Sequence, residues 1–151
     1  IEFNLEIVTN RFMKDFGVSR KIAKLHEIEC KKYLLLCGLY PNIRLGMKGS
    51  VDSYWHTFLL FTKDYFQFCE KVAGGFIHHV PKINNDRNEM DTYENTVEIY
   101  KAFFGKLPDN RVWGNNSRIF SCEPAPSCEP APSCEPAPSC ESAPSCESAV
   151  Q

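Results

Sequence analysis

A six-residue repeat fills residues 121–151, and it limits the folded part of the chain to the residues before it. From Ser121 the sequence reads SCEPAP three times, then SCESAP and SCES. A period of six is too short for a solenoid unit. Frequent proline and few apolar side chains cannot offset the entropy cost of ordering. We therefore expect a helical domain over residues 1–120 and a disordered low-complexity tail over residues 121–151.

Within residues 1–120, apolar side chains recur at helical spacing between glycine and proline breaks. This pattern predicts an all-α fold, a small bundle of four or five helices with one short extended segment. The glycines at 17, 38 and 74 are each expected to end a helix. The predicted helices cover 4–16, 20–37, 51–73 with a break near Thr62, and 92–104; loops cover 42–49 and 84–91, and residues 76–81 are extended.

Two further expectations concern particular residues of the helical domain, which we call the body. Glu27, Lys31 and Lys32 of the second predicted helix lie opposite its apolar stripe, so they are expected on a solvated face. Trp113 follows the last predicted helix among polar residues. The chain is expected to fold back at this point, so that the Trp113 side chain packs against the core as a terminal plug.

Charge and cysteine usage narrow the class of protein. The net charge of −2 divides into +3 for residues 1–120 and −5 for the tail, which carries five glutamates and no lysine or arginine. Basic residues are not clustered, which argues against nucleic-acid binding.

No apolar run approaches the ~18 residues of a membrane span. Only three cysteines fall in the body, which favours a reducing, cytoplasmic setting. The chain opens on Ile1 rather than Met, which leaves open whether a leader precedes it.

Residues 51–81 hold three of the four histidines and form the candidate metal site. Asp52 and His56 are four residues apart, so they share a helix face. Adjacent histidines in an extended segment point in opposite directions, so only one of His78 and His79 easily meets His56. Cys69 joins this group only if the helix breaks near Thr62. Histidine is the commonest metal ligand, so the pattern suggests a transition metal such as zinc or copper; it identifies no catalytic residue.

The same residues also have a purely structural interpretation. Trp55 and His56 then fill the edge of the core, with the imidazole bonded to Asp52 or to a loop carbonyl. His78 or His79 then holds the extended segment against the bundle. Cys69 lies among apolar residues, where a buried thiol acts as a small hydrophobic group rather than as a nucleophile.

The tail thiols form a second candidate site. Soft thiolates favour Cu(I) or zinc, although an extended tail must fold back to surround one ion. Disulfide cross-linking, surface attachment, multivalent contact with a partner and a merely solvated repeat are the alternatives. The cysteines concerned recur every six residues: Cys122, Cys128, Cys134, Cys140 and Cys146.

A set of residues recurs in a specific order: Asp52, Trp55-His56, Thr62, Tyr65, Cys69, Gly75, Phe76-Ile77-His78-His79 and Pro81, followed by Thr92 to Trp113. This order resembles the glycine-rich domain-containing protein-like family, over about residues 19–113. That resemblance implies a fold but no reaction. Many relatives carry a second histidine where this chain has Phe58, so no role for a His-x-His pair is implied.

These observations predict a non-enzymatic binding or accessory module, metal- or thiol-dependent, with a tethered cysteine-rich arm. The first alternative is a metal-dependent enzyme of unknown substrate, centred on Asp52, His56, His78 and His79. The second is a plain protein-interaction domain. The expected partner is a metal ion or an unidentified protein.

Overall fold

The computed structural model describes residues 2–80 and 88–114, and this part of the chain contains six α-helices and no strand. The all-α prediction is confirmed. The predicted tail at 121–151 lies outside the described residues, as does Pro81 at the end of the predicted extended segment. The helices are α1 (Glu6–Phe16), α2 (Arg20–Leu39), α3 (Ser50–Leu59), α4 (Thr62–Ala73), α5 (Asn88–Phe104) and α6 (Asn110–Trp113).

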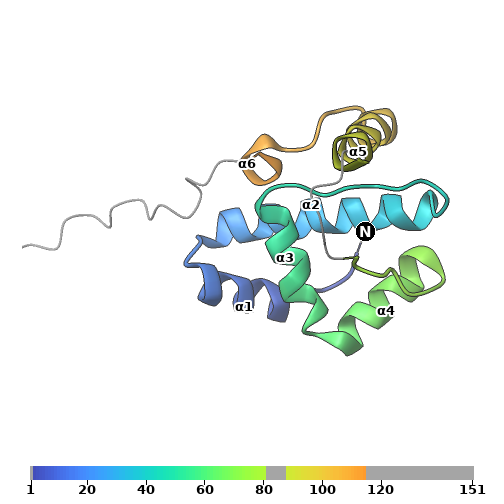
Figure 1. Cartoon of the computed structure of the whole chain (residues 1–151). Helices are drawn as coiled ribbons and strands as arrows, with labels where there is room; N and C mark the ends of the chain where they lie inside the picture. Colours follow the sequence, from blue (N-terminus) through green and yellow to red (C-terminus); the bar gives the residue numbers. More distant parts are fainter. Residues whose placement is uncertain (1, 81–87, 115–151) are drawn as a thin grey trace, which may run out of the picture.

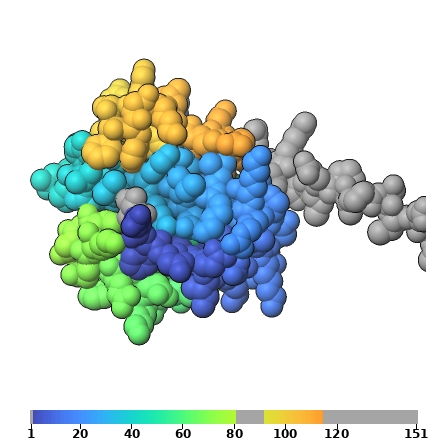
Figure 2. Space-filling model, turned by 180° about the vertical axis from the view of Figure 1, so that it is seen from behind, coloured from blue at the N-terminus to red at the C-terminus, as the bar shows by residue number. Residues whose placement is uncertain are grey.

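Helix α2 is the centre of the fold and contacts each of the other five helices. Figure 1 shows α1, α3 and α4 on one side of α2, and α5 and α6 on the other. The reverse view in Figure 2 shows the same division, with α2 between the two groups. The core lies mainly between α2 and the first group, with Trp113 of α6 closing one end. Its largest fully buried apolar side chains include Phe12, Leu34, Tyr54, Phe58, Tyr65, Phe68 and Trp113. None of the described helices is long and apolar enough to cross a membrane.

The prediction that this charged face of α2 is exposed to solvent is wrong. Glu27 and Lys31 are buried, because α1 covers this side of α2. The Glu27 carboxylate accepts hydrogen bonds from Lys31 Nζ at 2.7 Å and Lys24 Nζ at 2.6 Å. It also accepts one from Thr9 Oγ1 of α1 at 2.6 Å. Buried charges are tolerated when they are paired and hydrogen-bonded in this way.

Lys32 belongs to a second buried group, which joins α2 to α5 and α6. The Glu29 carboxylate, only 2% exposed, accepts hydrogen bonds from three donors. These are Lys32 Nζ at 2.7 Å, the Tyr100 hydroxyl at 2.8 Å and Trp113 Nε1 at 2.9 Å. Trp113 is buried, as predicted for a terminal plug. One carboxylate therefore holds three helices together.

Two predicted boundaries need correction. Helix α5 begins at Asn88, so residues 88–91 are helical rather than part of a loop. Gly38 does not end α2, which continues to Leu39. A Cβ at position 38 would lie 2.7 Å from the Val72 carbonyl oxygen and 2.9 Å from the Ala73 Cβ. Gly38 therefore permits the close approach of α2 and α4.

The predicted break near Thr62 is confirmed and positions the candidate site. Helix α3 ends at Leu59, and α4 begins at Thr62 after a turn in which the Phe61 N–H donates to the Phe58 carbonyl at 3.0 Å. The turn folds α4 back so that the Tyr65 hydroxyl accepts a hydrogen bond from Trp55 Nε1 at 3.1 Å. Gly74 then ends α4 with a φ of 65°, a conformation that costs glycine little.

A buried histidine joins α2, α3 and α6. His26 Nδ1 lies 2.8 Å from the Ile22 carbonyl oxygen, which can only accept, so Nδ1 carries the proton. His26 Nε2 lies 2.8 Å from Ser50 Oγ, which is also 3.3 Å from the Val112 carbonyl oxygen. Burial lowers the pKa of His26 below its usual value, because desolvation disfavours the charged imidazolium.

His26 is expected to make the protein acid-sensitive. In the unfolded chain a histidine binds a proton below about pH 6.5, whereas folded His26 does so only at lower pH. Because the unfolded state then holds more protons, the free energy of unfolding should fall as the pH drops below about 6.5. Urea unfolding at several pH values would measure this, with His26→Gln as the comparison. An equal pH dependence in both proteins would contradict the assignment.

Candidate metal site

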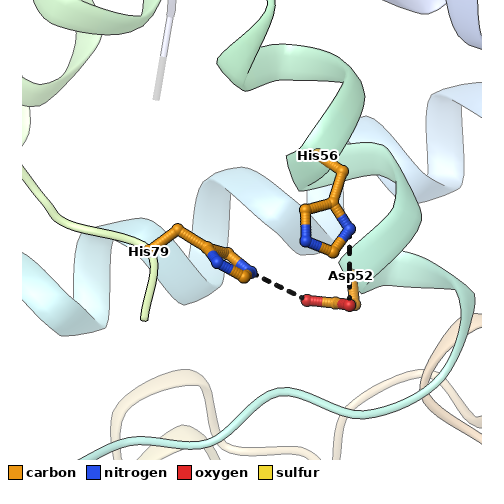
Figure 3. Close-up of side chains that lie close together, drawn as sticks. All are labelled: Asp52, His56 and His79. Carbon is orange, nitrogen blue, oxygen red and sulfur yellow. Dashed lines mark hydrogen bonds and ion pairs between the residues drawn. The ribbon is translucent and has the colours of Figure 1, made fainter. Parts of the chain in front are cut away.

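The candidate site lies where α3 meets the segment that follows α4. Asp52 is in the first turn of α3, and His56 follows one turn later on the same face. His79 comes from the extended stretch over residues 76–80. Figure 3 shows the two imidazoles approaching the Asp52 carboxylate from these two elements. The site therefore combines residues that are 27 positions apart in the sequence.

The carboxylate bridges the two histidines. His56 Nδ1 lies 3.5 Å from Asp52 Oδ2, and His79 Nε2 lies 3.4 Å from Asp52 Oδ1. The two imidazole centroids are 4.5 Å apart. The His79 side chain is 15% exposed and that of His56 is 53% exposed. The site is therefore mostly buried at His79 and open to solvent at His56.

The three residues can offer one ligand atom each, and these atoms all lie within 4.8 Å of one another. Two donors bound to zinc at ~2.0–2.1 Å with tetrahedral geometry are ~3.3–3.4 Å apart. His79 Nε2 lies 3.4 Å from Asp52 Oδ1 and His56 Nδ1 lies 3.5 Å from Asp52 Oδ2, so each distance is close to that spacing but involves a different carboxylate oxygen. For one carboxylate oxygen and both imidazoles to share a cation, the ligand atoms, which now lie within 4.8 Å of one another, would have to draw closer together.

Two of the predicted ligands, His78 and Cys69, lie outside this group. His78 is exposed and packs on Phe76, with ring centroids 4.9 Å apart. The alternation of an extended chain explains this, since it sends neighbouring side chains in opposite directions. Cys69 is fully buried in α4. The helix break that could have brought it to the site exists, but it turns Cys69 into the core.

The body thiols are poorly suited to nucleophilic chemistry. Cys30, Cys37 and Cys69 are all free cysteines. Burial raises the pKa of Cys37 to about 12 and that of Cys30 well above its usual value. The pKa of Cys69 is also raised, again chiefly by burial. Since the thiolate is the reactive form, these positions agree with the expectation that Cys69 acts as a small hydrophobic group.

A family model described as UCP032817-like matches residues 3–98, which is more than half of the chain. The protein belongs to the UCP032817-like family. The matched region runs from the segment before α1 into α5, and it includes Asp52, His56 and His79. Neither the curated proteins nor the solved structures contain a match to this chain.

This match corrects the family expected from the sequence. The resemblance to the glycine-rich domain-containing protein-like family is wrong, because the family model that matches is UCP032817-like. The resemblance depended on a sparse set of residues between about 19 and 113. The UCP032817-like match also takes in α1, which that set did not cover. The UCP032817-like family is uncharacterised, so membership supplies no reaction.

A pocket lies close to the candidate site in this UCP032817-like protein. Its volume is about 380 Å³, within the range of small-molecule sites. Trp55 and His78 contribute to its wall, and the Trp55 indole contacts the His79 ring at a centroid distance of 4.4 Å. Among the described residues the lining contains no Asp, Glu, Lys or Arg: it comprises Tyr33, Cys37, Gly38, Tyr40, Pro41, Ile43, Leu45, Trp55, Ala73, Gly75, Phe76, Ile77 and His78.

Sequence reasoning missed the hydrogen bonds that support His79. The Tyr65 hydroxyl donates to the Ile77 carbonyl at 2.6 Å, two residues before His79. Tyr65 was identified only as part of a motif, without a role. Trp55 and Tyr65 are separated by a helix break, so no helical spacing relates them. Only the angle between α3 and α4 brings the two side chains together.

Proposed function

We propose that this protein is a non-enzymatic binding module that holds a divalent transition-metal ion through Asp52, His56 and His79, with zinc as the best candidate. The observation that carries this proposal is the convergence of two imidazoles and a carboxylate, from two separate elements, with ligand atoms within 4.8 Å. Cys69 and His78 have no part in it.

The donor set supports the choice of metal. Two imidazole nitrogens and one carboxylate oxygen suit zinc and other first-row ions, and a site of three protein ligands leaves coordination positions for water or a partner group. Exposure of His56 leaves room for such a group. When bound, zinc would act as a Lewis acid and lower the pKa of a coordinated water. Copper is the alternative ion, since imidazole also binds it well.

The compartment we propose is reducing, such as the cytoplasm. Support comes from the free thiols Cys30, Cys37 and Cys69 in the folded body. Proteins of oxidising compartments commonly convert such cysteines to disulfides. In a reducing setting the five tail thiols would also be available as soft ligands or contact points for a partner protein.

A metal-dependent enzyme is the second candidate, and one observation favours it. A pocket of about 380 Å³ lies on the other side of Trp55 from His79, and none of Asp52, His56 and His79 lines it. Catalytic metal sites keep an open position beside a substrate pocket. In this protein the pocket lining includes the rings of Tyr33, Trp55 and Phe76 and would suit a substrate with an aromatic ring. Metal-dependent conversion of such a compound by the loaded protein, lost in His79→Gln, would favour this candidate over a binding module.

Metal content is the experiment that tests the proposal. Full-length protein purified without a histidine tag would be loaded with zinc, dialysed and analysed by elemental mass spectrometry. We expect about one zinc per chain, lost in Asp52→Asn, His56→Gln and His79→Gln, because each change removes one of three protein donors. His78→Gln is the matched control, since it removes a neighbouring histidine that lies outside the group.

A second full-length variant separates the body site from the tail. In it, the five tail cysteines at positions 122, 128, 134, 140 and 146 are replaced by serine. Zinc retained by this variant supports the body site. If His79→Gln retains zinc and the variant without tail cysteines loses it, the metal belongs to the tail instead. Absence of zinc and copper from every protein would leave a protein-interaction domain as the function.

A further inference from the structure

His79 reaches the candidate site without the support of a helix. Residues 76–80 form no regular secondary structure, so backbone hydrogen bonds along a helix do not hold the imidazole in place. Asp52 and His56, in contrast, are carried by α3. The position of His79 must therefore depend on contacts that its own segment makes with the helices.

These contacts include a chain of two hydrogen bonds. The Trp55 indole N–H can only donate, and it donates to the Tyr65 hydroxyl oxygen at 3.1 Å. The single Tyr65 hydroxyl hydrogen is directed to the Ile77 carbonyl at 2.6 Å. Tyr65 is almost fully buried, so water does not compete for these bonds. The direction of both hydrogen bonds is thereby determined.

Ring contacts complete the link to the imidazole. The Trp55 indole and the His79 ring are in T-shaped contact, with a centroid distance of 4.4 Å and an interplanar angle of 64°. Trp55 is on α3, next to His56 and three residues from Asp52. The helix that carries two of the candidate ligands therefore also anchors the segment that brings the third.

We infer that Tyr65 is a positioning residue for metal binding, acting through the Ile77 carbonyl on the location of His79. This inference rests on the proposed function, since it concerns the same site. Tyr65 offers no ligand atom itself. Its hydroxyl holds residues 76–80 against the α3–α4 corner, so that His79 Nε2 stays within 3.4 Å of the Asp52 carboxylate. A group that hydrogen-bonds directly to a metal ligand typically accounts for ~10–100-fold in metal affinity. Tyr65 acts one step further away, through the backbone of the segment that carries His79, so we expect an effect toward the lower end of that range.

The test is zinc affinity in Tyr65→Phe, measured on the full chain by competition with a chromophoric chelator. The phenylalanine keeps the ring contacts with Phe58 at 5.1 Å and Phe76 at 5.3 Å, and removes only the hydroxyl. We expect zinc affinity to fall toward the lower end of the ~10–100-fold range. Tyr54→Phe is the matched control, because it removes another buried hydroxyl on these helices, one that contacts Thr9 at 2.8 Å instead. Its zinc affinity should equal that of the wild type.

A second measurement does not need the metal. In the metal-free proteins, the His79 ring proton resonances in NMR spectra should shift in Tyr65→Phe and stay in place in Tyr54→Phe, since the Trp55 ring current acts on His79 at close range. Wild-type protein that binds no zinc would overturn this inference together with the proposed function. Zinc binding by the wild type and equally tight binding by Tyr65→Phe would overturn this inference alone.

Discussion

Replacing Trp55 by alanine is expected to lower the free energy of unfolding by about 3–5 kcal/mol, the range for a large buried aromatic side chain. Trp55 is only 5% exposed and packs on Tyr33 at a centroid distance of 5.5 Å. The substitution also removes the donor that fixes the Tyr65 hydroxyl. Its effect should therefore combine a cavity in the core with a weaker hold on residues 76–80.

Urea unfolding followed by circular dichroism would measure this change. Leu60→Ala is a suitable control, because Leu60 is 67% exposed and its truncation should change the free energy of unfolding by less than about 0.5 kcal/mol. Trp55→Phe keeps an aromatic ring and should lower the free energy of unfolding less than Trp55→Ala does. A loss below about 1 kcal/mol in Trp55→Ala would be too small for a core tryptophan.

Replacing Glu29 by alanine is the second change with a large expected effect. Removing one partner of a buried, hydrogen-bonded charge pair typically costs about 3–5 kcal/mol, because the other charge loses its compensation. Here three donors lose one acceptor: Lys32 Nζ, the Tyr100 hydroxyl and Trp113 Nε1. Because they come from α2, α5 and α6, the packing of α5 and α6 on α2 should weaken.

Two comparisons make this second prediction specific. Glu29→Gln keeps one acceptor oxygen and should lose less stability than Glu29→Ala. Glu98→Ala removes an exposed carboxylate on α5 and should be nearly neutral. The near-ultraviolet circular dichroism signal of Trp113 should decline in Glu29→Ala before global unfolding. Equal stability of Glu29→Ala and Glu98→Ala would show that the buried carboxylate is not needed to hold α5 and α6.

Local patterns in the sequence were sufficient to predict most of the helices. Apolar spacing predicted the positions of α1, α3 and α4, and the ends of α1 and α4 at Gly17 and Gly74 agree with the structure. The break near Thr62 was also predicted correctly. These features depend on nearby residues alone. The same holds for the pairing of Asp52 with His56, which follows from one turn of helix.

Contacts between distant residues could not be obtained in that way. Helical spacing indicates which face of a helix is most apolar, but not how many neighbours surround it. For this reason the central place of α2, with Glu27 and Lys31 buried beneath another helix, was missed. The choice of His79 over His78, and the part played by Tyr65, depend likewise on the angle between α3 and α4. Residue types and spacing along the chain set the helices and the set of candidate ligands, whereas the packing of helices around α2 decided which of those side chains meet.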